Sequence, residues 1–173
     1  MELKILSKEA IPRALQRVER YRLLNEPREA ESICLDVLRA DPQNQEALAM
    51  LILALTDQFG HGFGVTMEHA RKVLPQLTDE YERAYYAGVI TERWGKAQIR
   101  NNVPNHVVED WLRQAMQWFE NAEKISPPDN DDALIRWNTC ARIIERGRSD
   151  HPHSTTPPPV HYHSGLDDDV PLL

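Results

Sequence analysis

Apolar residues recur at helical spacing along most of the chain, and proline, glycine, asparagine and aspartate interrupt the periodic segments. The pattern is clearest before Ala40, where Ala30, Ile33, Cys34 and Val37 fall on one helical face. The interruptions divide the chain into about seven predicted helices, at residues 9–24, 27–40, 47–55, 66–76, 78–99, 104–125 and 130–147. The sequence therefore predicts an all-α fold.

Two segments stand out within this pattern. Residues 47–55 are apolar on nearly every side, so we expect this helix to lie in the middle of the helical stack. Residues 58–65 contain Gly60, Gly62 and Gly64 and are too rich in glycine to continue a helix. At the other end, Gly147 is predicted to terminate the last helix.

Two of the predicted helices share an alternation of small and larger residues that ends in proline. The spacing A-x-x-x-F-x-x-A-x-x-x-x-P occurs at Ala115, Phe119, Ala122 and Pro127, and again with smaller side chains at Ala30, Cys34, Val37 and Pro42. Small residues let a second helix approach closely, and proline ends a helix because it lacks an N–H group. Each segment is thus expected to be the second helix of a helix-turn-helix unit.

This spacing resembles the tetratricopeptide repeat, whose unit of about 34 residues reads W-x2-L-G-x2-Y, then A-x3-F, then P. Tyr21 takes the tyrosine position of a first unit, Leu48 and Leu51 match a second, and Gly88 takes the glycine position of a third. The resemblance implies an antiparallel helix-hairpin solenoid of about three units, with insertions, in a domain of residues 1–147. An ordinary helical bundle is the alternative, since such spacings occur there too.

The resemblance also implies a function, because the first helices of such units line a concave groove that binds an extended peptide or a helix of another protein. Met50, Tyr85 and Tyr86 would give this groove an adaptable apolar surface. The alternative is that its apolar members, above all Leu53 and Val89, belong to the core. By this register the exposed groove positions are Leu15, Glu19, Arg22, Ala49, Met50, Leu53, Tyr85, Tyr86, Val89, Glu92 and Arg93.

Composition restricts the classes of partner. The chain has 173 residues, 41% of them hydrophobic, which suffices for one ordinary core. A formal net charge of -7 argues against nucleic acid or an anionic membrane as the partner and slightly favours a basic protein. No apolar run matches a signal peptide or a membrane span, so we expect a cytoplasmic protein. Cys34 and Cys140 fall on apolar helix faces and are expected to be buried thiols.

The sequence carries no recognised catalytic motif, such as G-x-x-x-x-G-K-[ST], G-x-S-x-G, H-E-x-x-H or paired C-x-x-C. We therefore expect a chain that is not an enzyme and that needs no cofactor. His61, His69 and His106 are expected to serve surface or capping roles rather than to bind a metal. The many Glu and Arg residues between Glu80 and Arg100 are interpreted as a solvated helix face.

Residues 148–173 are rich in proline and histidine, lack helical periodicity and are predicted to be disordered. Two H-x-H pairs, His151 with His153 and His161 with His163, are weak metal-binding candidates. The tail ends in an acidic run followed by apolar residues, which can dock as a linear motif on a second protein or fold back into the chain's own groove. This candidate motif is Leu166, Asp167, Asp168, Asp169, Val170, Pro171, Leu172 and Leu173.

Together these features predict a non-enzymatic protein-protein interaction adaptor or scaffold. Two alternatives stay open at this point. One is a small acidic chaperone for a secreted protein, and the other is a metal-handling protein that uses the tail histidines.

Overall fold

The computed structural model describes residues 2–150, and every regular element in this range is helical. The α-helices are α1 (Ile11–Leu23), α2 (Pro27–Ala40), α3 (Gln45–Asp57), α4 (Met67–Arg71), α5 (Glu80–Arg100), α6 (Asn105–Glu123) and α7 (Asp132–Asp150). Two short 3-10 helices, η1 (Lys8–Ala10) and η2 (Leu74–Gln76), complete the set. The predicted all-α class is confirmed.

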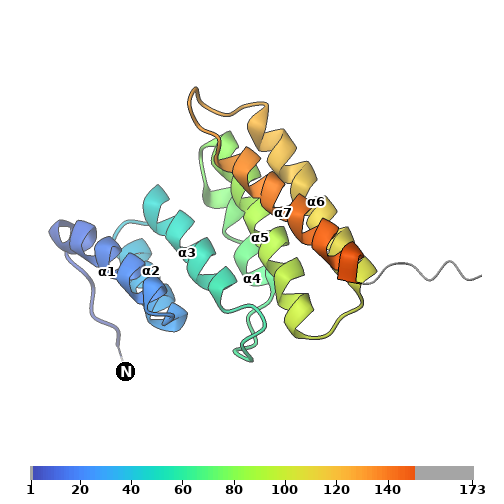
Figure 1. Cartoon of the computed structure of the whole chain (residues 1–173). Coiled ribbons are helices and arrows are strands. Elements are labelled where there is room, and N and C mark those ends of the chain that lie inside the picture. The colour runs from blue at the N-terminus through green and yellow to red at the C-terminus, as the bar shows by residue number, and fades with distance from the viewer. Residues whose placement is uncertain (1, 151–173) are drawn as a thin grey trace, which may run out of the picture.

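The helices pack mainly against their neighbours in sequence (Figure 1). Helix α2 lies against α1 and α3, and α6 lies against α5 and α7. Helix α3 joins the two groups because it also contacts α1, α4 and α5. This position explains its apolar sequence, in which Leu48, Ile52 and Ala54 are fully buried.

The small and larger residues identified in α2 and α6 face the core as expected. Ala30, Cys34 and Val37 have no exposed surface, and neither do Ala115, Phe119 and Ala122. The α5–α6 contact is especially close at Gly88, where an added Cβ would lie 2.5 Å from Cε1 of Phe119. Only glycine fits this position without displacing the ring.

Most helix ends lie close to those predicted, and identifiable caps set several of them. The Asn44 side chain accepts a hydrogen bond from the Ala47 amide at 2.9 Å, and the Asp79 side chain accepts one from the Glu82 amide at the same distance. Helix α3 gives way to turns after Asp57, and Gly60, Gly62 and Gly64 all have φ between 71° and 77°. The glycine-rich segment is therefore a connector, as predicted.

Two predicted boundaries are wrong. The segment 66–76 is not one helix, because α4 ends at Arg71 and a separate 3-10 turn contains Pro75, which cannot donate a backbone hydrogen bond. Helix α7 does not end at Gly147 but runs through it to Asp150. Arg148 in this added turn donates to the Glu109 carboxylate of α6, which fixes the last turn of α7 to its neighbour.

The Glu109 carboxylate makes the docking of this last turn dependent on pH. It accepts hydrogen bonds from Arg113 at 2.7 and 3.0 Å and from Arg148, and these bonds lower the pKa of Glu109 below its ordinary value of 4.5. A lowered pKa means that the ionised form stabilises the fold above about pH 4.5 and that this contribution disappears as the pH falls through the folded pKa. Because Glu109 is partly exposed and both arginines are more than half exposed, the contribution is below about 1 kcal/mol.

We therefore expect Glu109→Gln to melt at a lower temperature than the parent chain at pH 7 and at nearly the same temperature at an acid pH at which Glu109 is protonated in the folded chain. Thermal unfolding followed by circular dichroism at both pH values checks this. A difference in melting temperature that is constant across the pH range would contradict the assignment.

The two cysteines are free and fully buried, Cys34 in α2 and Cys140 in α7. Burial is the main reason that the pKa of each thiol is raised to about 12. This confirms the expectation that both are buried thiols, and it makes them poor targets for thiol reagents in the folded chain.

Candidate binding face

The predicted groove residues do not share one environment. Leu15, Ala49, Val89 and Glu92 are buried, so the expectation that they are exposed is wrong. Leu15 packs in a cluster with Ile11 and Val37, and Val89 packs among the buried residues of α6. Glu19 is exposed, and the remaining members are half-buried: Arg22, Met50, Leu53, Tyr85, Tyr86 and Arg93.

The half-buried apolar members contribute to packing between helices. Met50 and Tyr86 border the core cluster around α3, and Leu53, Tyr85 and Tyr86 border the cluster around α6. Tyr85 stacks on Tyr81 at 5.8 Å between ring centroids and meets Tyr86 edge-on at 5.2 Å. Burial raises the pKa of Tyr86 to about 12, with Glu82 adding to the effect. These tyrosines therefore expose only part of their surface to solvent.

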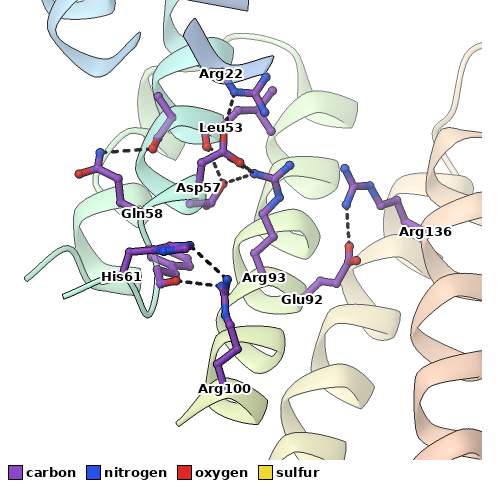
Figure 2. A network of polar contacts seen from close by, with 12 residues as sticks. Arg22, Leu53, Asp57, Gln58, His61, Glu92, Arg93, Arg100 and Arg136 are labelled. Atoms are coloured by element: carbon purple, nitrogen blue, oxygen red, sulfur yellow. Dashed lines mark hydrogen bonds and ion pairs between the residues drawn. The ribbon is translucent and has the colours of Figure 1, made fainter. Parts of the chain in front are cut away.

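A group of charged side chains crosses the same region. The Arg22 Nε of α1 donates to Oδ2 of Asp57 at the end of α3, at 2.7 Å. Arg93 of α5 donates to the other oxygen of Asp57 and, through the same Nη1, to Thr56 Oγ1 at 2.9 Å. Asp57 thus joins three helices through two guanidinium groups (Figure 2).

The neighbouring residue Glu92 forms a second set of ion pairs. Its carboxylate is completely buried and accepts hydrogen bonds from Lys96 of α5 and, at 3.0 Å, from Arg136 of α7. Figure 2 shows Glu92 directed toward Arg136, away from Asp57. The interpretation of Glu80–Arg100 as a solvated face is therefore wrong for Glu92. Its acidic side chain is buried because the neighbouring helix supplies a cation.

These six side chains, Arg22, Asp57, Glu92, Arg93, Lys96 and Arg136, are called the arginine network below. The guanidinium groups are close enough to affect one another. Burial is the main cause that lowers the pKa of Arg93; Asp57 opposes this, while Arg136 and Arg22 lower the pKa further. The network holds four cations and two carboxylates, so its local charge is positive in a chain whose net charge is -7.

Sequence reasoning places Arg22, Glu92 and Arg93 on this face but misses Asp57, Lys96 and Arg136. One signal is present, because Glu92 and Lys96 stand four residues apart on one helix, the spacing of a helical ion pair. Nothing in the sequence indicates that Arg136 of α7 meets Glu92, because the two residues are 44 positions apart.

A separate set of polar contacts holds the glycine-rich connector. Arg100 of α5 donates to the Phe59 carbonyl at 3.0 Å and lies 3.1 Å from His61 Nε2. His69 accepts from the Thr66 amide at 3.1 Å and caps α4. No group of three or more possible metal ligands occurs between residues 2 and 150. The capping role expected for these histidines is thus observed for His69.

Two hollows on the surface do not coincide with the arginine network. Their volumes are about 410 and 270 Å³, and both lie between α1 and α2. Tyr21, Arg28 and Ile33 line the first, and Leu6, Arg17 and Ile33 are among the residues of the second. Neither includes a predicted groove residue, so the network belongs to an open face rather than to one of these hollows.

Comparison with known proteins provides no relative: no family profile matches the chain, and no curated protein or solved structure is significantly similar to it. None of the helices that the structure describes is long and apolar enough to cross a bilayer. The predicted tail features, namely the histidine pairs at 151, 153, 161 and 163 and the motif at 166–173, lie outside the described residues.

Proposed function

We propose that the chain is a non-enzymatic adaptor of the tetratricopeptide type, in which the face of α1, α3, α5 and α7 binds an extended peptide or a helix of another protein. The observation that carries this proposal is the arginine network, whose two sets of ion pairs together join side chains of all four helices. The partner chain would cross these helices and meet each in turn.

The packing of α5 on α6 supports the repeat assignment. Gly88 and Phe119, which take the glycine and phenylalanine positions of such a unit, lie in direct contact, and Ala115 and Ala122 of the same motif are fully buried. In α2, the equivalent positions Ala30 and Cys34 are buried in the same way. The same motif positions are thus buried in α2 and in α6.

The arginines keep donors available for a partner. Among the described residues, Arg22 and Arg93 each make hydrogen bonds through a single nitrogen, although a guanidinium has five N–H donors. Arg136 donates to Glu92 and also interacts with the Tyr85 side chain. No buried side-chain nitrogen or oxygen within residues 2–150 is left without a partner, so the unused donors reach solvent. The three side chains are 19%, 21% and 27% exposed. Carboxylates and backbone carbonyls of a bound peptide are suitable acceptors.

In the binding experiment, a displayed library of random peptides is selected for binding to the full chain. The selected sequences are synthesised, and their Kd values are measured by fluorescence anisotropy for three variants. We expect Arg22→Gln and Arg136→Gln each to weaken binding by about tenfold, because each removes a charge-assisted hydrogen bond. Arg113→Gln is the matched control, since Arg113 is also ion-paired but lies on α6, and it should change Kd less than twofold.

Circular dichroism melts show whether each variant is folded at the assay temperature. The proposal is wrong if the chain selects no peptide that binds after resynthesis. It is also wrong if folded Arg22→Gln and Arg136→Gln bind as tightly as Arg113→Gln.

A further inference from the structure

Building on the binding face proposed above, we infer that residues 166–173 of this chain dock on the arginine network of the same molecule. The acidic run Asp167–Asp169 meets the guanidinium groups, and the flanking apolar residues meet the tyrosines. The tail is then an internal competitor that a partner must displace.

Charge complementarity is the first argument. The four cations of the network exceed its two carboxylates, and the unused donors of Arg22, Arg93 and Arg136 reach solvent. Asp167, Asp168 and Asp169 are three consecutive aspartates. Carboxylates accept paired hydrogen bonds from guanidinium groups, which makes an aspartate run a suitable occupant for a row of arginines.

Other carboxylates near the face do not fill this role. Glu82 is close enough to raise the pKa of Tyr86, and Asp132 that of Tyr81, but neither forms an ion pair with an arginine within residues 2–150. Glu82 lies in the first turn of α5, and Asp132 is the first residue of α7. The network therefore keeps its excess of cations in the folded chain.

The chemistry of the flanking residues also matches the face. Leu166, Val170 and Leu172 border the aspartates in the sequence. On the face, Tyr85 and Tyr86 form a half-buried aromatic pair. Arg22 is close enough to lower the pKa of Tyr86, and Tyr85 is close enough to raise that of Arg136. Arginines thus lie beside apolar surface on the face, and aspartates lie beside apolar residues in the tail segment.

The connecting chain is long enough. Helix α7 carries Arg136 in its second turn and ends at Asp150, so its end lies about 21 Å from Arg136 along the helix axis. Asp167 follows 17 residues later. Seventeen residues span at most about 55 Å when fully extended, which is more than twice that distance. The aspartates can therefore return to the face without strain.

A tether of this length gives the segment an effective concentration near 1 mM at the face. A segment whose intrinsic Kd is about 0.1 mM would then occupy the face in about nine of ten molecules and would weaken partner binding by about tenfold. Only partners that bind the face tightly enough to displace the tail would then form a complex.

The test uses the full chain with a nitroxide at Ser164→Cys. Cys34 and Cys140 are fully buried with raised thiol pKa values, so the label attaches selectively to the new cysteine. We expect the label to broaden the NMR signals of the Arg22, Arg93 and Arg136 side chains and of Tyr85.

The control is the triple variant Asp167→Asn/Asp168→Asn/Asp169→Asn, which should remove the broadening, and 0.5 M salt should reduce it strongly. The triple variant leaves the helices untouched, so loss of folding does not complicate the comparison.

Two outcomes would overturn the inference. In the first, broadening is confined to the last turn of α7 or is unchanged in the triple variant. In the second, equally strong broadening appears when spin-labelled protein at natural nitrogen abundance is mixed with ¹⁵N protein that carries no spin label, which means that the tail binds a second copy. The peptide assay tests the proposed function independently. If peptides bind the network but the tail does not dock, the proposed function holds and this inference is wrong. If the tail docks but no peptide binds, this inference holds and the proposed function is wrong.

Discussion

Replacing Gly88 with valine is expected to lower the free energy of unfolding by about 3 kcal/mol, because the new side chain must displace a buried ring. A Cβ at this position would lie 2.5, 2.7 and 2.9 Å from three carbon atoms of Phe119. Phe119 has no exposed surface and is enclosed by Ala115, Ala122 and Tyr85, so its ring has little room to move. Chemical denaturation of the full chain, compared with the parent, measures the loss.

Gly147→Ala is the matched control, since Gly147 is also inside a helix but a Cβ added there would lie more than 4 Å from any neighbouring side chain. We expect this change to stabilise the chain by about 0.5–1 kcal/mol through helix propensity. Combining Gly88→Val with Phe119→Leu should recover part of the loss by removing the opposing ring. If Gly88→Val and Gly147→Ala shift stability in the same direction, the close α5–α6 contact is not what excludes a side chain.

The second large effect is expected at Glu92, where replacement by glutamine should lower the free energy of unfolding by about 3 kcal/mol. The carboxylate is fully buried and is shared between Lys96 and Arg136, and Arg136 belongs to another helix. Glutamine keeps the shape but not the charge, so two cations lose their partner in a half-buried position. Chemical denaturation at neutral pH checks the value.

Glu109→Gln is the control for Glu92→Gln. Glu109 is also shared between two arginines, but it is partly exposed and its arginines are more than half exposed, so its removal should cost less than about 1 kcal/mol. Equal losses at the two sites would show that the Glu92 ion pairs behave as surface pairs.

A combined variant, Glu92→Leu/Lys96→Leu/Arg136→Leu, separates stability from binding. Buried ion pairs are often replaced by apolar residues without loss of stability, so we expect this variant to fold. It should nevertheless lose the peptide binding that depends on Arg136. This outcome would indicate that the network is kept for recognition rather than for holding α5 against α7.

Local signals predict the helices well. The first amides of a helix have no acceptor within the helix, and the side chains of Asn44 and Asp79 supply one at the starts of α3 and α5. Pro27 begins α2 because proline has no amide hydrogen that would need an acceptor there. Helix ends are harder to predict. Gly147 is a common stop signal, yet α7 continues because Arg148 finds a partner on α6. A tertiary contact thus outweighs a weak local preference.

The candidate face is predicted less well, for a reason visible in α5. This helix contacts α3, α4, α6 and α7, so its buried surface is wider than the single stripe that a periodicity argument assumes. Periodicity therefore places Val89 and Glu92 on the open side although both are fully buried. For Val89 the error concerns only which side of the helix is buried. The burial of Glu92 depends in addition on a cation, Arg136, that a distant helix supplies.

The sequence by itself determined the all-α class, the approximate helices and the faces of α2 and α6 that turn inward. These follow from hydrogen bonds and side-chain contacts within four residues along the chain. Only the tertiary structure decided which charges meet, because Asp57 and Glu92 take partners that are 35 and 44 positions away. Whether a charged side chain is buried and paired or left in water depends on such distant partners, and the local pattern does not contain them.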